Sequence, residues 1–194
     1  MEIVVLLRPR RGDFIYDADE KAVLLDDLGA FVELGVQSFA IGALRAEGEL
    51  DVDFLAELSQ AAGPAKLTCH RAFDHVARPL VAMEQLIELG FKRLLTSGQA
   101  ASAPQGAALI AELVERAAGR LELIAAAGVR PENVAALVQR SKVPSVHLSA
   151  SREQASPMQM SNIRATMGTG EVSDEFVRRI TDESVVRSCR IALS

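Results

Sequence analysis

Short apolar runs alternate with longer stretches of helical periodicity along most of the chain. The apolar runs predict six strands, over residues 3–7, 38–42, 67–74, 93–96, 121–125 and 145–149. Between them, apolar residues recur at the three- and four-residue spacing that gives a helix one buried face. Strands that alternate with helices in this way are typical of parallel sheets covered by crossover helices. The pattern therefore predicts an α/β fold built from six βα units.

Capping and helix-breaking residues indicate where the helices begin and end. Asp17 and Glu20 have the spacing of a capping box, and Gly35 is placed to end the helix that they begin. Pro79 suits the first turn of a later helix, which Gly90 ends. After residue 149 the sequence is polar without a clear period, so we expect a loop there. Similar signals predict further helices over 51–62, around 109–114, from 131 and over 182–192.

Two similar segments within the sequence support a fold built from a repeated βα unit. Residues 31–42 and 86–97 share one order of helix, glycine and strand. A full TIM-type (β/α) barrel of eight such units would need roughly 220 residues at this strand spacing. The chain has 194 residues, enough for one hydrophobic core. We therefore expect a single domain over residues 1–194 that is either a barrel lacking two units or an open sheet.

Composition excludes several classes of partner. The net charge is −5 and basic residues cluster only at Arg8, Arg10 and Arg11, so no footprint for a nucleic-acid backbone is present. The first apolar run is too short for a signal core or a membrane span. Without a secretory leader, Cys69 and Cys189, which lie far apart in the sequence, are expected to be reduced thiols. We therefore predict a cytoplasmic protein that binds neither nucleic acid nor membranes.

The far end of the third expected strand carries titratable residues, His70 and Asp74, in place of the usual turn residues. In βα-repeat proteins, sites are built at the carboxyl ends of the strands. With a reference pKa of about 6.5, His70 is a candidate general acid or base. Asp74 is a candidate to orient its ring. The alternative is a strand-end histidine whose nitrogens are satisfied by the backbone.

Two arginines at strand ends, Arg8 and Arg71, are candidates for binding a carboxylate or phosphate through paired donors. The alternative gives them a structural role, in ion pairs with Asp13 or Asp74. We regard the two interpretations as equal on the sequence alone.

Other polar residues are expected at the same end of the sheet. Backbone amides at Ser97 and Gly98 are candidates for binding an anion at a helix start, although a plain tight turn is the simpler interpretation. His147 and Ser149 share one face of the last expected strand, because side chains alternate along a strand. If the sheet curls, we expect the following residues to converge: Arg8, His70, Ser97, His147 and Ser149.

Soft ligands suited to copper(I) are few. Cys69 and His70 are adjacent on a strand and point to opposite faces, which makes them poor joint ligands. Cys189 lies on an expected apolar helix face, which favours core packing. Met158 and Met160 are a weak candidate pair. The sequence therefore leaves the metal ligands unassigned.

Six segments, in order, resemble the CutC family of copper homeostasis proteins. The resemblance implies a (β/α) barrel, a cytoplasmic location and a role with copper, which makes a copper ion a candidate cofactor or partner. The segments that carry it are Leu-Arg-Pro-Arg-Arg-Gly-Asp-Phe-Ile-Tyr at 7–16, Thr-Cys-His-Arg-Ala-Phe-Asp at 68–74, Leu-Thr-Ser-Gly at 95–98, Gly-Val-Arg-Pro-Glu-Asn at 128–133, Val-His-Leu-Ser-Ala-Ser at 146–151 and Ser-Pro-Met at 156–158.

The chain departs from the family pattern in three places. It begins at what would be the third strand, so cysteine positions proposed for copper in relatives are missing, and the exposed edges predict a homo-oligomer. Arg11 replaces a glycine of the first arginine loop. The family's glycine-rich turn is Ala-Ala-Ala-Gly at 125–128. Because the methyl groups of Ala126 and Ala127 restrict positive φ, we expect no phosphate cradle there.

Three hypotheses for function follow. The first is a CutC-like role in copper homeostasis, including copper binding. The second is an enzyme that acts on a small anionic metabolite, a carboxylate or phosphate, at the barrel's C-terminal face. The third is a shortened relative that keeps the scaffold without the activity. Fingerprints for dinucleotides, P-loop nucleotide binding, zincin proteases and nucleophile-elbow hydrolases are absent from the sequence.

Overall fold

The six predicted strands form one parallel sheet in which each strand pairs with its neighbours in sequence. The computed structural model describes residues 2–158 and 176–194. The expected βα alternation is confirmed. The strands are β1 (Val5–Leu6), β2 (Ser38–Ile41), β3 (Lys66–Cys69), β4 (Arg93–Thr96), β5 (Glu122–Ala125) and β6 (Ser145–Val146).

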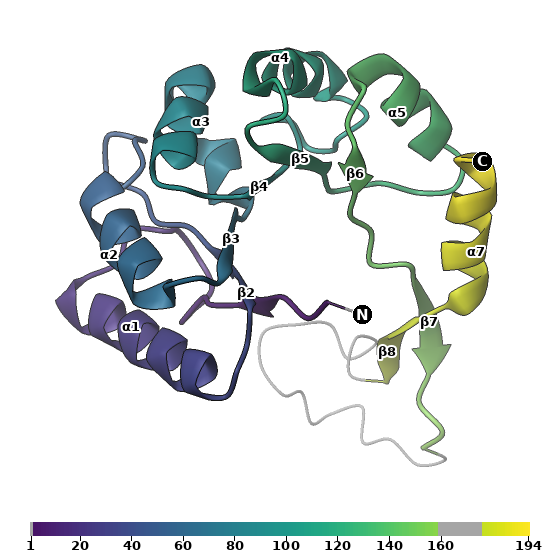
Figure 1. Ribbon diagram of the computed structural model, residues 1–194. Coiled ribbons are helices and arrows are strands. Elements are labelled where there is room, and N and C mark those ends of the chain that lie inside the picture. Colours follow the sequence, from purple (N-terminus) through teal and green to yellow (C-terminus); the bar gives the residue numbers. More distant parts are fainter. Residues whose placement is uncertain (1, 159–175) are drawn as a thin grey trace.

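The strands follow an arc, and helices cover its outer side (Figure 1). Within the described part of the chain, no helix is long and apolar enough to cross a membrane. The helices are α1 (Ala18–Glu33), α2 (Val52–Ala62), the 3₁₀ helix η1 (Arg71–His75), α3 (Pro79–Glu88), α4 (Ala107–Ala117), α5 (Val134–Ser141) and α7 (Glu183–Ala192).

Side-chain alternation along the strands separates the core from the inner face of the arc. On β2, Phe39 and Ile41 are buried in the apolar cluster between sheet and helices, while Ala40 lines a cavity on the inner face. On β3, Leu67 and Cys69 likewise enter the core. Every second residue of a strand therefore lies on the inner face, where a site can form.

The predicted helix boundaries are largely confirmed. The Asp17 carboxylate accepts from the amide of Glu20, and Glu20 accepts from the amide of Asp17, which completes the capping box. Pro79 is the first residue of α3. The start of α5 differs, at Val134 instead of residue 131. Asn133 explains this, because its side chain bonds the amide of Arg130 and the carbonyl of Gly128 and so holds a turn.

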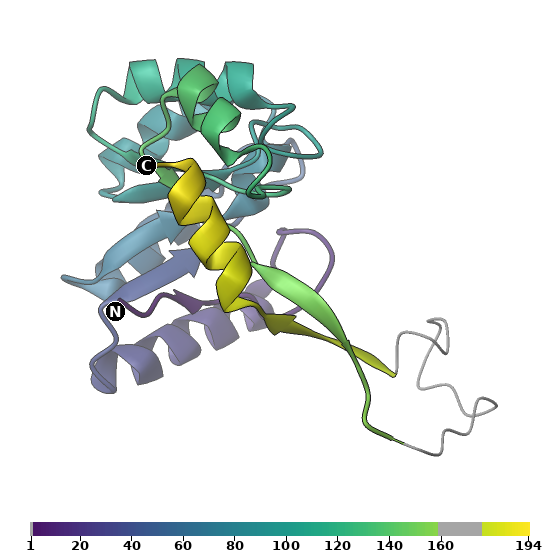
Figure 2. The same ribbon diagram turned by 90° about the vertical axis from the view of Figure 1, so that its right-hand side faces the viewer.

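The expected loop after residue 149 is instead an antiparallel hairpin of β7 (Ser151–Ala155) and β8 (Val177–Thr181). Nearly all its side chains are exposed on both faces, so no alternation of apolar and polar residues marks it. Figure 2 shows the hairpin leaving the sheet, with α7 returning beside it; α7 contacts α5. β6 also ends at Val146, earlier than expected, where the chain turns toward the hairpin.

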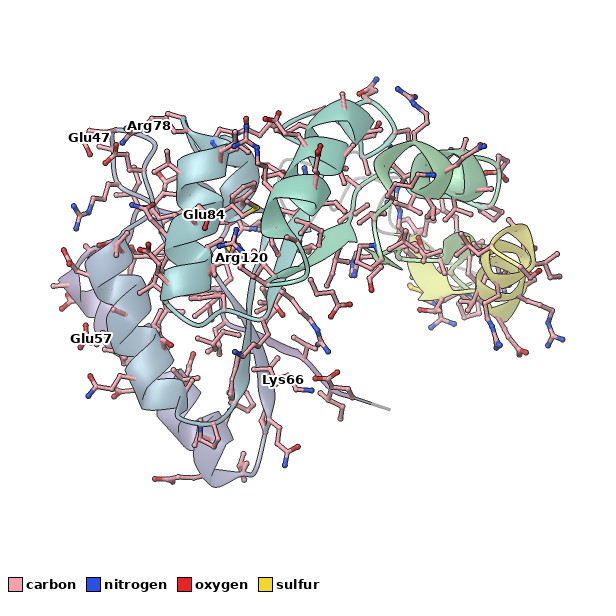
Figure 3. The ribbon with its side chains drawn as sticks, turned by 45° about the horizontal axis from the view of Figure 1, so that its top comes forward. Glu47, Glu57, Lys66, Arg78, Glu84 and Arg120 are labelled. Atoms are coloured by element: carbon pink, nitrogen blue, oxygen red, sulfur yellow. The ribbon has the colours of Figure 1, made fainter. Side chains whose placement is uncertain are left out.

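Ionic contacts gather at the amino-terminal end of the sheet. Arg93 donates to Glu2 at 2.8 Å and to Glu122 at 3.1 Å. The pKa of Glu2 falls to about 2 because Arg93 and Ser38 donate to its carboxylate. Lys66 lies at the same end, 3.8 Å from Glu2 (Figure 3). This end of the arc is therefore occupied by paired charges.

The outer edges of β1 and β6 have no partner strand among the elements that the structure describes. Ile3, Val4 and Leu6 at the β1 edge are exposed apolar side chains. A homo-oligomer that covers these edges stays a prediction.

Candidate functional site

Four of the predicted site residues line one cavity of about 510 Å³ on the inner face of the sheet, here called the inner cavity. They are Arg8, His70, Arg71 and His147, which follow β1, β3 and β6. Asp74, Ser97, Gly98 and Ser149 do not line it. Parallel strands therefore bring together residues that are up to 139 positions apart in the sequence.

His70 caps the N-terminus of η1. Its Nδ1 accepts from the amide of Ala72 at 3.1 Å. Because Nδ1 must accept, the proton of the neutral ring is on Nε2, which is buried and has no partner among the residues described. Burial, followed by the positive charge of Arg8, lowers the pKa of His70 to about 4. The ring is therefore neutral at pH 7 and has an N–H available for donation.

The His70 ring is fixed by its neighbours. The ring of Phe14 packs against it, with centroids 5.1 Å apart. Gly42 faces the other edge, and a Cβ at that position would lie only 2.7 Å from Cε1 of His70. Only glycine at position 42 leaves room for the imidazole, so the end of β2 helps to position the end of β3.

Asp74 does not contact His70, contrary to the expectation from the sequence. It accepts from Arg71 Nε at 2.7 Å, Thr96 Oγ1 at 2.6 Å and the amide of Ser97 at 2.9 Å. In a 3₁₀ helix, residues i and i+3 are aligned, which places Asp74 beside Arg71 and turns it away from His70. The nearly buried carboxylate therefore joins η1 to the end of β4.

The Ser97–Gly98 segment is a tight turn whose amides are already used. The Ser97 amide donates to Asp74, and the Gly98 amide donates to Thr96 Oγ1 at 2.9 Å. Gly98 has φ +69, and a Cβ there would lie 2.2 Å from the carbonyl oxygen of Gly106. The simpler interpretation from the sequence fits the structure, because the anion held here is the protein's own carboxylate.

The two candidate arginines have different partners. Arg71 pairs with Asp74, as the structural alternative expected, and it also donates to Ser97 Oγ at 3.2 Å. Arg8 does not pair with Asp13, whose carboxylate binds Arg10 instead. Arg8 donates to the carbonyl of Gly12, and its guanidinium carbon lies 4.6 Å from the Phe14 ring centroid. Arg8 thus keeps its charge without a carboxylate partner among the described residues.

A second cavity, of about 710 Å³, adjoins the inner one and is here called the outer cavity. Arg71 and His147 line both cavities. Ser149 lines the outer one only, with its Oγ 3.2 Å from Ser151 Oγ. Sequence reasoning missed Arg130, which also lines this cavity, although Arg130 follows β5 at a carboxyl end and that position was the available signal.

The described residues do not assemble a copper(I) ligand set. Cys69 is fully buried on the core side of β3, where burial and then the charge of Asp74 raise its thiol pKa to about 12. Cys189 is buried on α7. Met158 is exposed, and Met160 lies outside the described residues. Within residues 2–158 and 176–194, no group of three or more His, Cys, Asp or Glu side chains is placed to hold a metal.

The neutral state of His70 predicts a pH dependence of stability. The unfolded chain, with a histidine pKa of about 6.5, takes up the proton before the folded protein does as the pH falls. The stability from the neutral ring is thus present above about pH 6.5 and is lost as the pH falls toward 4. Between pH 7 and 5, we expect this linkage to lower the free energy of unfolding by about 2 kcal/mol.

Urea denaturation of the wild type and of His70→Asn at both pH values measures this effect, since Asn keeps an acceptor for the Ala72 amide. His70→Asn should lack the part of the pH-dependent loss that comes from His70. The other titrating groups are the same in both proteins, so their effects cancel in the comparison. An equal loss in both proteins would contradict a neutral, buried His70.

The Asp74 contacts predict a strong effect of truncation. Asp74→Ala leaves Thr96 Oγ1 and the Ser97 amide without their acceptor and Arg71 without its ion pair. We expect the free energy of unfolding to fall by about 3–5 kcal/mol, measured by chemical denaturation. Asp13→Ala is the matched control, because Asp13 also pairs with an arginine three residues away but is exposed, and it should change stability far less. Equal effects would show that Asp74 does not hold η1.

Comparison with known proteins places this geometry in a family. The model of the CutC family matches residues 1–152. A CutC family protein from Chromobacterium violaceum is 44% identical over 188 residues, covering 97% of this chain and 76% of the relative. Another, from Glaesserella parasuis serovar 5, is 40% identical over 185 residues, covering 95% and 75%.

Solved structures are also similar to this chain. A crystal structure of CutC from Streptococcus agalactiae is 29% identical with a TM-score of 0.73, covering 76% of this chain and 72% of that one. The aldolase QR15, at 18% identity and a TM-score of 0.59 over 75% and 66% of the two chains, shows a likeness in fold alone. Both are consistent with a (β/α) barrel. From the family match and the identity to these relatives, the chain belongs to the CutC family.

Proposed function

We propose that this chain binds a small anionic metabolite, a carboxylate or a phosphate, at the carboxyl ends of its strands. The observation that carries the proposal is the inner cavity, which Arg8, His70 and Arg71 line together. Its volume of about 510 Å³ is within the usual range for small-molecule sites.

The charges around the inner cavity favour an anion. Arg8 has only a carbonyl and an aromatic ring as partners among the described residues, so its charge is available to a ligand. Arg71 is 44% exposed, and its pair with Asp74 uses only part of its five donors. Glu122 also lines the cavity, but it is paired at 3.1 Å with Arg93, a third arginine of the lining. The balance of uncompensated charge is therefore positive.

In this proposal, His70 acts as a hydrogen-bond donor and not as a base. Its Nδ1 is occupied by the Ala72 amide, and its Nε2 carries the proton, so neither nitrogen has a free lone pair. A neutral imidazole of this kind can donate a hydrogen bond to a ligand oxygen without a competing charge. His70 then binds or polarises an oxygen beside the two arginines.

A thermal-shift screen with inorganic phosphate and small carboxylates tests the proposal. A ligand at 100 times its dissociation constant should raise the free energy of unfolding by about 2.7 kcal/mol. Arg8→Gln should weaken binding by roughly tenfold or more, because it removes a charged hydrogen bond. The matched control Arg11→Gln removes the same charge from an exposed position nearby and should bind like the wild type. No shift with any anion, or equal weakening in both variants, would refute the site.

Copper homeostasis is the second candidate function, and family membership is the observation that favours it. The relative from Streptococcus agalactiae carries that function in its name. Because Cys69 is buried and protonated and lies on the core side of β3, we propose that the described residues take part in copper homeostasis without binding copper(I) tightly. A cytoplasmic location stays a prediction.

Titration of the reduced protein with copper(I) against a competing chelator tests this second proposal. We expect an affinity no tighter than micromolar, unchanged in Cys69→Ser. Tight binding that Cys69→Ser abolishes would overturn it and would show that β3 opens to release its thiol.

A further inference from the structure

The turn after β5 adopts the conformation that its alanines were expected to prevent. Ala127 has φ +75 and Gly128 has φ +67, so two successive residues lie in the left-handed region. An L-residue such as alanine is strained there and stays only where its surroundings determine the backbone. Although a methyl group restricts positive φ, Ala127 adopts it, and such strained residues cluster at functional sites.

Contacts on both sides hold the turn. The Ala126 amide donates to the carbonyl of Thr96 at 2.8 Å, and the carbonyl of Ala127 accepts from the Ala103 amide at 2.9 Å. Gly128 packs so closely on Ser102 that a Cβ would lie 2.9 Å from the serine Cβ. These contacts impose the positive φ of Ala127 from outside the turn itself.

The amides of Ala127 and Gly128 remain available. Neither donates a hydrogen bond to another residue in the described part of the chain. Successive amides in a turn of this kind form a concave site that favours anions. The same two residues line the outer cavity, so the amides border a space of about 710 Å³.

The side chains around the outer cavity include one arginine, Arg130, whose charge is not paired within the described part of the chain. Arg152 is paired with Asp182 at 3.2 Å, and Arg179 lies 3.8 Å from Glu153. Arg130 has no carboxylate within ion-pairing distance among residues 2–158 and 176–194. Arg71, also in the lining, is paired with Asp74, so Arg130 is the lining arginine whose guanidinium is left for a ligand among the described residues.

We propose that the outer cavity binds the phosphate group of a phosphorylated small metabolite, through the amides of Ala127 and Gly128 with Arg130 and His147. Arg71 and His147 line both cavities, so one ligand can place its phosphate in the outer cavity and its remaining atoms in the inner one. A phosphate, with three terminal oxygens, matches donors that approach from several sides better than a carboxylate does. This inference rests on the proposed function and narrows it to one class of anion.

Titration with inorganic phosphate, followed by amide NMR and calorimetry, tests the inference. In the wild type, phosphate should shift the amide resonances of Ala127 and Gly128. Arg130→Gln should weaken phosphate binding at least tenfold. Arg140→Gln is the matched control, because it removes the same charge from an exposed position on α5, away from the cavity, and should bind phosphate within twofold of the wild type.

Other outcomes separate this inference from the proposed function. If phosphate binding depends on Arg8 but is unchanged in Arg130→Gln, the inner cavity binds anions and the outer phosphate site is refuted. The outer phosphate site is also refuted if only carboxylates bind and their binding depends on Arg8. If neither phosphate nor any carboxylate binds the wild type, both proposals fail.

Discussion

The site geometry depends on the contacts that the carboxylate of Asp74 makes. This carboxylate is nearly buried, and an unpaired charge in such a place would be strongly destabilising. Hydrogen bonds from Arg71, Thr96 and Ser97 compensate it and connect η1 to the end of β4. Because Arg71 is the first residue of η1 and His70 caps it, the contacts that neutralise Asp74 also determine where His70 and Arg71 lie. A structural ion pair thereby positions two ligand-binding candidates.

The sheet supplies the second constraint. Parallel strands end at a common edge. Of each two successive residues in a strand, one has its side chain on the inner face. Thus Thr68 and His70 line the inner cavity while Cys69, between them, is in the core. This explains why the buried thiol and the imidazole cannot act on one ligand, although they are adjacent in sequence.

The sequence predicted those parts of the fold that depend on local pattern. The alternation of strands with helices and the Asp17–Glu20 capping box are visible in the chain itself, and the structure has both. Of the candidate site, Arg8, His70, Arg71 and His147 were found from their places at strand ends, and they share a cavity. What escaped prediction depends on tertiary contacts. That Asp74 turns away from His70 and accepts from Thr96 and Ser97 follows from the 3₁₀ geometry of η1, and the φ of Ala127 follows from its bond to Ala103.

The hairpin β7–β8 stands outside the βα repeat, yet Arg152 and Arg179 from it form part of the outer cavity wall. Its side chains are mostly exposed, so few of them contribute to the core. Substitutions there should therefore cost little folding free energy, because few contacts with the core are lost. The outer cavity wall can therefore vary in shape and charge at little cost in folding free energy, whereas the residues around Asp74 are constrained by stability.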